Sequence, residues 1–337
     1  MRDLNSLGLK TAGGRVLVLD QTRLPDVEEW LDGTAPAALM EHIRRLSVRG
    51  APLIGVSAAL SVAAYAEGGA SRTHLAQACA SLREARPTAV NLAWAMDQMR
   101  GVLDAGGGVS ELVQRAEAIF DQDAEFCERM ANHGAALIAP GEGLLTHCNT
   151  GGLVTAGIGT ALGVIRRAHE LGRDVHVFVD ETRPLLQGAR LTAWELGRLG
   201  IPHTLITDSM AASVLAKGKV QRVLVGADRI ARNGDFANKV GTYALAIVAR
   251  YHGVPFHPVA PWSTVDLACA SGQDIPIEER AASEVRGYGG MRWAPSTVQV
   301  FNPAFDVTPV ALIESLILDR GVFPRSALAQ GLALTER

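Results

Sequence analysis

One segment sets the architecture of this chain, Leu144-Leu145-Thr146-His147-Cys148-Asn149-Thr150-Gly151-Gly152. It starts as an apolar run of strand length and then reaches a cysteine. A second segment, Val223-Leu224-Val225-Gly226-Ala227-Asp228, repeats the pattern and ends in an acid. The carboxyl ends of parallel strands open onto the ligand crevice of an α/β protein. We therefore expect the thiol of Cys148 and the carboxyl group of Asp228 to face one substrate.

The sequence around both segments alternates between strand-like and helix-like stretches. Beyond Pro140-Gly141, apolar runs of strand length are separated by helical patterns, which is typical of βαβ units and a parallel sheet. The expected strands cover residues 144–147, 175–179, 203–206, 223–225, 256–259 and 298–301.

The preceding part of the chain is mainly helical. Residues 15–20 fit a short strand, and helical patterns follow at 36–46, 52–66, 73–85, 91–104 and 110–138, the last expected to be broken once. A chain of 337 residues exceeds what one hydrophobic core usually organises. We predict an α/β fold with two domains. A mainly helical N-terminal domain with a short β segment covers 1–139, and a Rossmann-like C-terminal domain with a largely parallel sheet covers 140–337.

Composition narrows the class of protein. A hydrophobic content of 48% with 20% charged residues is that of a globular protein, and a net charge of −3 argues against nucleic-acid or anionic-membrane partners. The N-terminus lacks the apolar core of a signal peptide, and the longest apolar run, 52–66, fits a buried helix better than a membrane span. The four cysteines show no Cys-x-x-Cys spacing, so we expect neither a zinc site nor disulfides, and a reducing cytoplasm is the simplest location.

The two proposed reactive residues each have a structural alternative. Cys148 could be a small buried hydrophobe, but its position where a strand ends and a helix is expected to begin would favour the thiolate. Asp228 could cap a turn or pair with Arg229. An aspartate is ionised at neutral pH unless burial raises its pKa, so acid catalysis by Asp228 would require an apolar setting.

Several polar residues are candidates for binding. An arginine followed by free backbone N–H groups at a helix start suits a phosphate, although a lone arginine there is usually a solvated side chain. Other polar groups follow the expected strand ends, although turns at the protein surface often have the same composition. The candidate binding segments are Arg49-Gly50-Ala51-Pro52, Arg86-Pro87-Thr88, Gln187-Gly188-Ala189-Arg190 and Asn238-Lys239.

A glycine pattern, Gly157-Ile158-Gly159, offers a nucleotide-binding alternative, with Asp180 at the expected distance for a ribose contact. These glycines come well after the strand ends, however, and Gly151-Gly152 already fills the tight turn. A glycine-rich helix packed close to the sheet is the favoured interpretation, and backbone N–H groups at 149–152 that face an anion at a helix start are compatible with it. The histidines show no metal-ligand spacing.

Taken together, the motifs resemble the methylthioribose-1-phosphate isomerase family. The resemblance runs from about Arg15 to Pro309 and rests on seven segments in order: Arg49-Gly50-Ala51-Pro52, Arg86-Pro87-Thr88, Thr146-His147-Cys148-Asn149, Asp180-Glu181-Thr182-Arg183-Pro184, Gln187-Gly188-Ala189-Arg190, Val225-Gly226-Ala227-Asp228-Arg229 and Ala237-Asn238-Lys239-Val240-Gly241-Thr242. The sequence departs from the family pattern at Leu185-Leu186 and at Ala281-Ala282.

The resemblance implies an isomerase of methionine salvage that converts methylthioribose 1-phosphate to methylthioribulose 1-phosphate, with Cys148 and Asp228 in the catalytic positions. By the same resemblance, the substrate-binding positions, chiefly around the phosphate and the sugar hydroxyls, are matched by Arg49, Gly50, Ala51, Arg86, Gln187, Asn238 and Lys239. No metal or nucleotide cofactor is implied, and a homodimer is. Proton transfer and hydride shift both stay open as mechanisms. The alternatives are a ribose-bisphosphate isomerase, a regulatory subunit of a translation-initiation exchange factor and, more remotely, a nicotinamide-dependent oxidoreductase.

Overall fold

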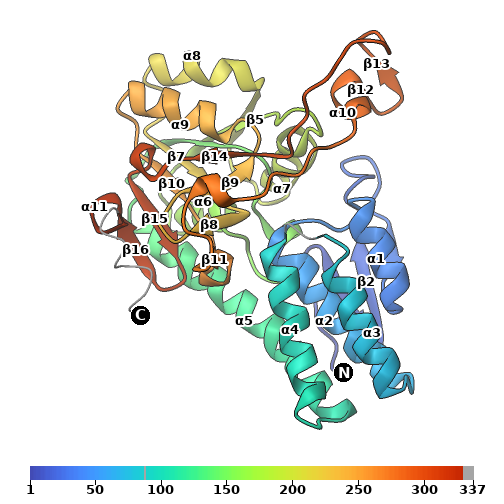
Figure 1. Ribbon diagram of the computed structural model, residues 1–337. Coiled ribbons are helices and arrows are strands. Elements are labelled where there is room, and N and C mark those ends of the chain that lie inside the picture. Colours follow the sequence, from blue (N-terminus) through green and yellow to red (C-terminus); the bar gives the residue numbers. More distant parts are fainter. Residues whose placement is uncertain (87–88, 329–337) are drawn as a thin grey trace. The chain divides into compact units, whose positions relative to one another are not determined.

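The computed structural model describes residues 1–86 and 89–328 (Figure 1). The chain divides into two compact units. The first comprises Met1–Arg129 with Thr150–Gly163, and the second comprises Met130–Asn149 with Val164–Arg337. The chain therefore crosses between units at three places, whereas a single boundary near residue 139 was predicted. Where the functional domains divide stays a prediction.

The first unit combines a small antiparallel sheet with a set of helices. Strands β1 (Leu9–Ala12), β2 (Arg15–Leu19) and β3 (Trp30–Asp32) form the sheet in that order. They are followed by α1 (Pro36–Arg44), α2 (Ala51–Glu67), α3 (Arg72–Arg83), α4 (Val90–Asp104) and most of α5 (Val109–Ala135). The predicted helices are confirmed to within a few residues at most of their ends. The predicted break in the last one is wrong, because its buried residues recur at helical spacing without interruption, from Leu112 through Ala116 and Ile119 to Cys127.

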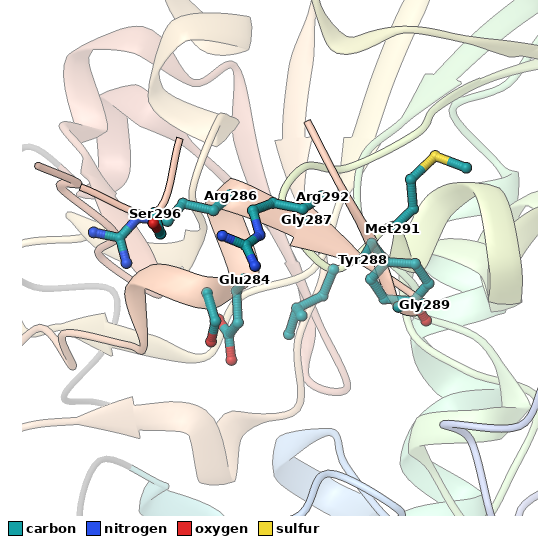
Figure 2. Close-up of a pocket in the computed structure, with 11 residues that line it drawn as sticks. Glu284, Arg286, Gly287, Tyr288, Gly289, Met291, Arg292 and Ser296 are labelled. Carbon is teal, nitrogen blue, oxygen red and sulfur yellow. The ribbon is translucent and has the colours of Figure 1, made fainter. Parts of the chain in front are cut away.

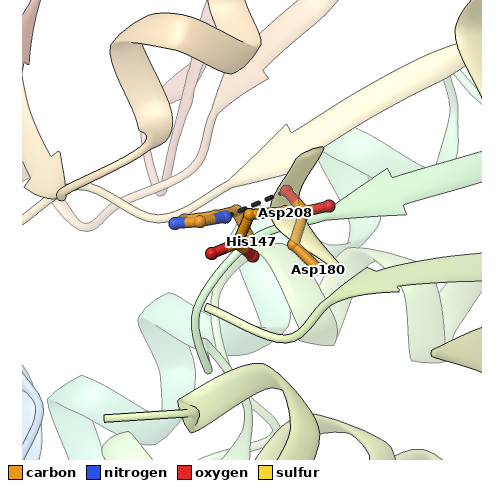
Figure 3. A group of neighbouring side chains, drawn as sticks. All are labelled: His147, Asp180 and Asp208. Carbon is orange, nitrogen blue, oxygen red and sulfur yellow. Dashed lines mark hydrogen bonds and ion pairs between the residues drawn. The ribbon is translucent and has the colours of Figure 1, made fainter. Parts of the chain in front are cut away.

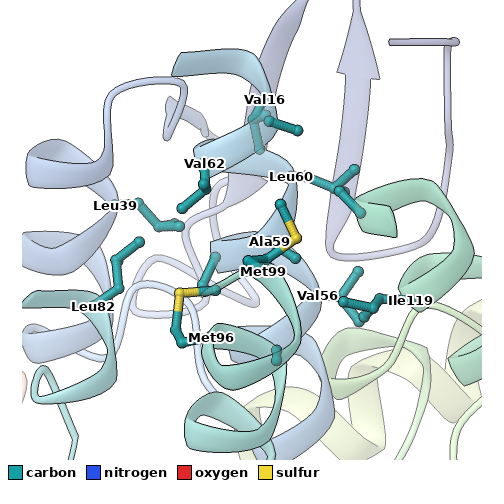
Figure 4. Close-up of a cluster of buried hydrophobic side chains, with 14 of the residues drawn as sticks. Val16, Leu39, Val56, Ala59, Leu60, Val62, Leu82, Met96, Met99 and Ile119 are labelled. Atoms are coloured by element: carbon teal, nitrogen blue, oxygen red, sulfur yellow. The ribbon is translucent and has the colours of Figure 1, made fainter. Parts of the chain in front are cut away.

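Helix α2 is the centre of the first core. Fourteen of its 17 residues are buried, so the helix is apolar on all sides, as expected for one enclosed by other elements. Figure 4 shows Val56, Leu60 and Val62 of this helix among side chains from α1, α3, α4 and α5. Each fully buried leucine or valine contributes roughly 1.5–3 kcal/mol relative to an exposed one.

The second unit is built on a five-stranded parallel sheet. Its strands are β4 (Gly143–Thr146), β5 (His176–Asp180), β6 (His203–Ile206), β7 (Arg222–Val225) and β10 (Phe256–Pro258), in the spatial order β10-β7-β4-β5-β6. The predicted parallel sheet is confirmed. Numbered along the chain, this order is 3-2-1-4-5 read from β6, as in doubly wound sheets, and it reverses between β4 and β7.

Further elements surround this sheet. The helices are α6 (Ala161–Glu170), α7 (Ala193–Arg198), α8 (Ala211–Ala216), α9 (Thr242–Tyr251), α10 (Ala282–Arg286) and α11 (Arg325–Leu328). A second sheet has the order β11-β8-β9-β14, and two hairpins complete the unit. Their strands are β8 (Arg229–Ala231), β9 (Phe236–Lys239), β11 (Val265–Asp266), β12 (Gly287–Tyr288), β13 (Met291–Arg292), β14 (Phe305–Thr308), β15 (Ser315–Leu318) and β16 (Gly321–Pro324).

One predicted strand is wrong. Residues 298–301 form no strand, and Phe301 is 80% exposed while Val298 is 42% exposed. An apolar run becomes a strand only where a partner edge and a buried face are available, and here both come a few residues later. Strand β14 pairs antiparallel with β9 instead, with Asp306 opposite Asn238.

Candidate active site

The two predicted reactive residues follow neighbouring strands of the parallel sheet. Strand β4 pairs with β7 in the register Leu144 to Arg222 and Leu145 to Val223. Cys148 lies two residues beyond the end of β4, and Asp228 lies three residues beyond the end of β7. The strand order reverses between these two strands, and this switch point is where ligands bind in open α/β sheets. The predicted positions at the carboxyl ends of two strands are therefore confirmed, whereas the roles stay predictions.

Cys148 is buried, and its backbone is strained. Its φ of 68° lies in the left-handed region, which is uncommon for residues other than glycine. Its N–H donates to Oγ1 of Thr182 over 2.8 Å, and its carbonyl oxygen accepts from Oγ1 of Thr192 over 2.6 Å. Backbone strain of this kind is concentrated at functional sites.

The expected helix start beside Cys148 is wrong. A three-residue 3₁₀ turn (Gly152–Val154) comes first, and α6 begins only at Ala161. Local hydrogen bonds and backbone geometry, and not a helix dipole, therefore define the surroundings of this thiol.

His147 anchors the end of β4. Its Nδ1 lies 2.9 Å from Oδ2 of Asp180, its Nε2–H donates to the carbonyl oxygen of Val240 over 2.9 Å, and the imidazole is 1% exposed (Figure 3). Burial by itself would lower the pKa of His147, but the hydrogen bond and negative charge of Asp180 outweigh it and raise that pKa. Gly241 makes room for the ring, since a Cβ there would lie 2.8 Å from Cε1 of His147.

The group formed by His147, Asp180 and Asp208 also has atoms of the kind that bind metals, all within 4.8 Å of one another. Most of these atoms already have protein partners, the exception being the buried Oδ1 of Asp180, which accepts no hydrogen bond within the described residues. Both ring nitrogens are engaged as described, and the two carboxylate oxygens of Asp208 accept from the backbone N–H groups of Thr182 and Arg183, each over 2.7 Å. We interpret the group as a scaffold for the strand ends. The ribose contact considered for Asp180 is not supported, since its carboxylate binds His147.

Asp228 starts the turn into β8. It is partly buried, and its N–H donates to the carbonyl oxygen of Ala237 over 2.9 Å. The neighbouring Arg229 directs its guanidinium to Asp266, with Nε 3.8 Å from Oδ2. Because adjacent residues of an extended chain point to opposite faces, the cation that follows Asp228 serves a different carboxylate.

Strand β9 supplies two further predicted site residues, both buried. Asn238 donates from Nδ2 to Oγ1 of Thr242 over 3.0 Å. Lys239 donates from Nζ to the carbonyl oxygen of Ala304 over 2.7 Å, and its ammonium lies 4.7 Å from the ring centre of Phe305. A lysine is rarely this buried without a specific partner, so the strand holds a cation beside the turn that begins at Asp228.

Polar atoms without partners mark the region after β4 and β5. Gln187 is 3% exposed and Asn149 is 4% exposed, yet Oε1 of the first and Oδ1 of the second accept no hydrogen bond within the described residues. Buried acceptors are normally satisfied, and exceptions call for a water or a ligand. Asn149, Thr182 and Thr192 were not predicted as site residues. Their closeness in sequence to Cys148 and Gln187 was the available signal.

The arginine motifs lie in the first unit. Gly50 precedes α2 with a φ of 93°, and a Cβ there would lie 2.2 Å from Cβ of Val154, so only glycine fits. Arg49 and Arg86 are partly buried, and Ala51 is the first residue of α2. Pro87 and Thr88 lie outside the described residues. The structure groups Arg49, Gly50 and Ala51 at one helix start, as predicted.

One residue that departs from the family pattern, Leu185, lines a surface hollow of about 520 Å³ (Figure 2). The hollow is lined as well by residues of α10, which follows Ala281, and of the hairpin β12–β13. Two cation–π contacts join the hairpin region to the segment on either side of Gln187. Arg183 lies 4.8 Å from the ring centre of Trp293, and Arg190 lies 5.1 Å from that of Tyr288.

Comparison with known proteins agrees with this architecture. The initiation factor 2 subunit family matches residues 47–325. A methylthioribose-1-phosphate isomerase of Yersinia pestis (strain Pestoides F) is 56% identical over 333 residues, which cover 98% of this chain and 96% of that protein. The crystal structure of 5-methylthioribose 1-phosphate isomerase from Pyrococcus horikoshii OT3 superposes with a TM-score of 0.88 at 42% identity, covering 96% of this chain and 94% of the other.

A second solved structure, titled as translation initiation factor eIF-2B, subunit delta, from A. fulgidus, matches with a TM-score of 0.85 at 38% identity, covering 99% of this chain and 100% of that chain. Identity is higher to the protein named as an isomerase. The chain therefore belongs to the initiation factor 2 subunit family and, within it, to the methylthioribose-1-phosphate isomerase family.

Proposed function

We propose that this protein is an aldose–ketose isomerase that converts 5-methylthioribose 1-phosphate to 5-methylthioribulose 1-phosphate in methionine salvage. Relatives carry that name at 54–56% identity over nearly the full chain. One structural observation carries the proposal. A cysteine and an aspartate follow the two neighbouring strands between which the sheet order reverses, where a ligand crevice forms.

The substrate explains why two different groups are needed. Its anomeric oxygen carries phosphate, so the sugar ring cannot open spontaneously to a free aldehyde. We assign Asp228, in its protonated form, as the acid that donates to the ring oxygen while the bond from that oxygen to C1 breaks. We assign Cys148 to the hydrogen at C2, which moves to C1 as the C2 hydroxyl becomes a carbonyl. The proton that this hydroxyl loses replaces the one that Asp228 gave to the ring oxygen, so the acid is regenerated. An acid and a base with opposed environments can perform this exchange.

The seven predicted binding residues are assigned to the substrate. The start of the 17-residue helix α2 suits the phosphate, and it contains Arg49, Gly50 and Ala51. The first turn of the helix offers backbone N–H groups, and an arginine guanidinium can form two parallel hydrogen bonds to a phosphate. Arg86 is assigned to the same group. The buried Oε1 of Gln187, which accepts no hydrogen bond within the described residues, suits a sugar hydroxyl. Asn238 and Lys239 are assigned to the same sugar. Correct positioning of substrate by such groups can supply much of the rate enhancement.

A homodimer is part of the proposal. Tyr243, Ile247 and Tyr251 recur every four residues along α9 and are 42%, 43% and 84% exposed, which leaves an apolar stripe on one face of the helix. Ile247→Glu should shift the protein from dimer to monomer in light scattering. An unchanged dimer would place the subunit contact elsewhere.

The cytoplasm is the proposed location, and the proposed chemistry uses no metal or nucleotide. The four cysteines carry thiols and form no disulfide, which fits a reducing compartment. None of the helices within residues 1–86 and 89–328 meets the length and hydropathy that crossing a bilayer requires.

The direct test is ketose formation from two substrates. Purified protein is incubated with methylthioribose 1-phosphate and separately with ribose 1,5-bisphosphate, and the expected product arises from the first. Cys148→Ala and Asp228→Asn should each abolish turnover while circular dichroism stays unchanged, and Cys269→Ser should leave the rate unaffected as the control thiol variant. Turnover of only the bisphosphate would refute the substrate assignment. A folded protein that turns over neither sugar would favour a regulatory role, the alternative raised by the match to the exchange-factor subunit.

A further inference from the structure

The backbone at Cys148 adopts a conformation that its own sequence does not favour. Cys148 has a φ of 68°, and Thr182, after the neighbouring strand β5, has a φ of 66°. Threonine is β-branched, and such residues rarely adopt positive φ values. Two strained residues from segments 34 positions apart require interactions that hold both of them in place.

Hydroxyl groups supply these interactions on both sides of Cys148. Oγ1 of Thr182 accepts the Cys148 N–H over 2.8 Å and donates its own hydrogen to the carbonyl oxygen of Asp180 over 3.1 Å. Oγ1 of Thr192 donates to the Cys148 carbonyl oxygen over 2.6 Å. Thr182 is 0% exposed and Thr192 is 1% exposed, so water does not compete for these bonds. The N–H and the C=O of Cys148 are thus both fixed by threonine side chains.

The threonine at 182 is itself held in place. Its N–H donates to Oδ1 of Asp208 over 2.7 Å, and the next N–H, of Arg183, donates to Oδ2 of the same carboxylate over 2.7 Å. Asp180, two residues earlier, holds the imidazole of His147. Hydrogen bonds with residues 180–182 therefore hold both Cys148 and His147 in place.

We propose that Thr182 and Thr192 are positioning residues that orient the Cys148 thiol for the reaction. The inference rests on the proposed function, because it assigns these hydroxyls a role in that same site. With the Thr182 hydroxyl removed, the left-handed conformation of Cys148 loses its hydrogen-bonded support, and Sγ moves relative to the substrate. A displacement of about 1 Å at a reacting group can lower the rate roughly 100-fold.

The test compares Thr182→Val, which keeps the shape and removes the hydroxyl, with Thr182→Ser, which keeps the hydroxyl. We expect kcat for methylthioribose 1-phosphate to fall about 100-fold in the valine variant with KM changed less than about threefold. The serine variant should recover most of the rate. Thr204→Val is the matched control, because this threonine lies on the adjacent strand β6 and its hydroxyl is exposed and bonded to His176.

A second readout does not depend on turnover. The rate of iodoacetamide modification at Cys148, followed by peptide mass spectrometry across pH 6–9, should change in Thr182→Val, return in Thr182→Ser and stay unaltered in Thr204→Val. Normal kcat and normal modification rates in a folded Thr182→Val variant would overturn the inference. If that variant does not fold, Thr192→Val and Thr192→Ser give the same comparison, and unchanged values there would overturn it equally. An inactive wild-type protein would refute the proposed function, while the modification rates would still test the positioning of the thiol.

Discussion

Asp123 offers a quantitative prediction about stability. It lies on α5, is 9% exposed, and accepts the Ala156 N–H at Oδ2 over 2.6 Å. Burial raises its pKa to about 7, although the hydrogen bond from Ala156 opposes this rise. Along the same helix, burial and then the charge of Asp123 raise the pKa of Cys127. The segment that follows Cys148 in sequence thus packs onto an acid that is half protonated near neutral pH.

The sign of the effect follows from the two states of the protein. In the unfolded chain an aspartate has a pKa of about 3.9, so between about pH 4 and pH 7 the folded protein holds a proton that the unfolded chain has lost. The free energy of unfolding therefore falls as pH rises through this window, and it levels off above pH 7. About two pH units of the window lie above pH 5. At about 1.4 kcal/mol per unit, the loss between pH 5 and pH 8 is on the order of 3 kcal/mol.

Asp123→Asn removes this proton binding and keeps an oxygen that can accept from Ala156. We expect the variant to gain on the order of 3 kcal/mol relative to wild type between pH 5 and pH 8. Urea unfolding followed by tryptophan fluorescence at both pH values measures the difference. Asp121→Asn, on the same helix, is the matched control. Its carboxylate is 58% exposed and pairs with Arg2 at the surface, an interaction worth at most about 1 kcal/mol. If the free energies of unfolding of wild type and Asp123→Asn change by the same amount between pH 5 and pH 8, the reasoning is refuted.

Three further substitutions test the packing. Gly241→Ala should cost about 1–3 kcal/mol, seen as a lower Tm, because the residue has a φ of 107° and its new Cβ would crowd His147; an unchanged Tm would contradict this. Leu60→Ala in the fully buried centre of α2 should cost about 2–5 kcal/mol in urea unfolding. Glu142→Ala should cost about 3 kcal/mol or more of unfolding free energy, because the mostly buried Arg222 guanidinium loses the carboxylate that accepts two of its hydrogen bonds. A loss below about 1 kcal/mol would show that the pair behaves like a surface ion pair.

The sequence was sufficient to predict the sheet and the place of the reactive residues. Strands β4 and β7 are short apolar runs with abrupt polar ends, and parallel strands put those ends on one edge. The position of Cys148 and Asp228 relative to the strands therefore followed from local pattern alone. Helix α2 was also predictable, since a run of small apolar residues between Pro52 and Gly68 allows few other structures.

The backbone around Cys148 could not be predicted in this way. A helix start was expected, but the conformation depends on hydroxyls of Thr182 and Thr192, which lie 34 and 44 positions further along the chain. Such bonds exist only after the strands have paired. Asp123 shows the same limit, because a carboxylate on an amphipathic helix normally faces water, and its burial arises from the segment around Ala156 that packs over it.

The most direct test of the account is a single assay of three proteins with methylthioribose 1-phosphate. Wild type, Cys148→Ala and Asp228→Asn are compared at equal folded concentration by the rate of ketose formation. The account predicts turnover by the wild type and none by either variant. Near-normal turnover by a variant would remove the altered residue from the reaction, and near-normal turnover by both would contradict the assignment of the two strand ends as the catalytic site.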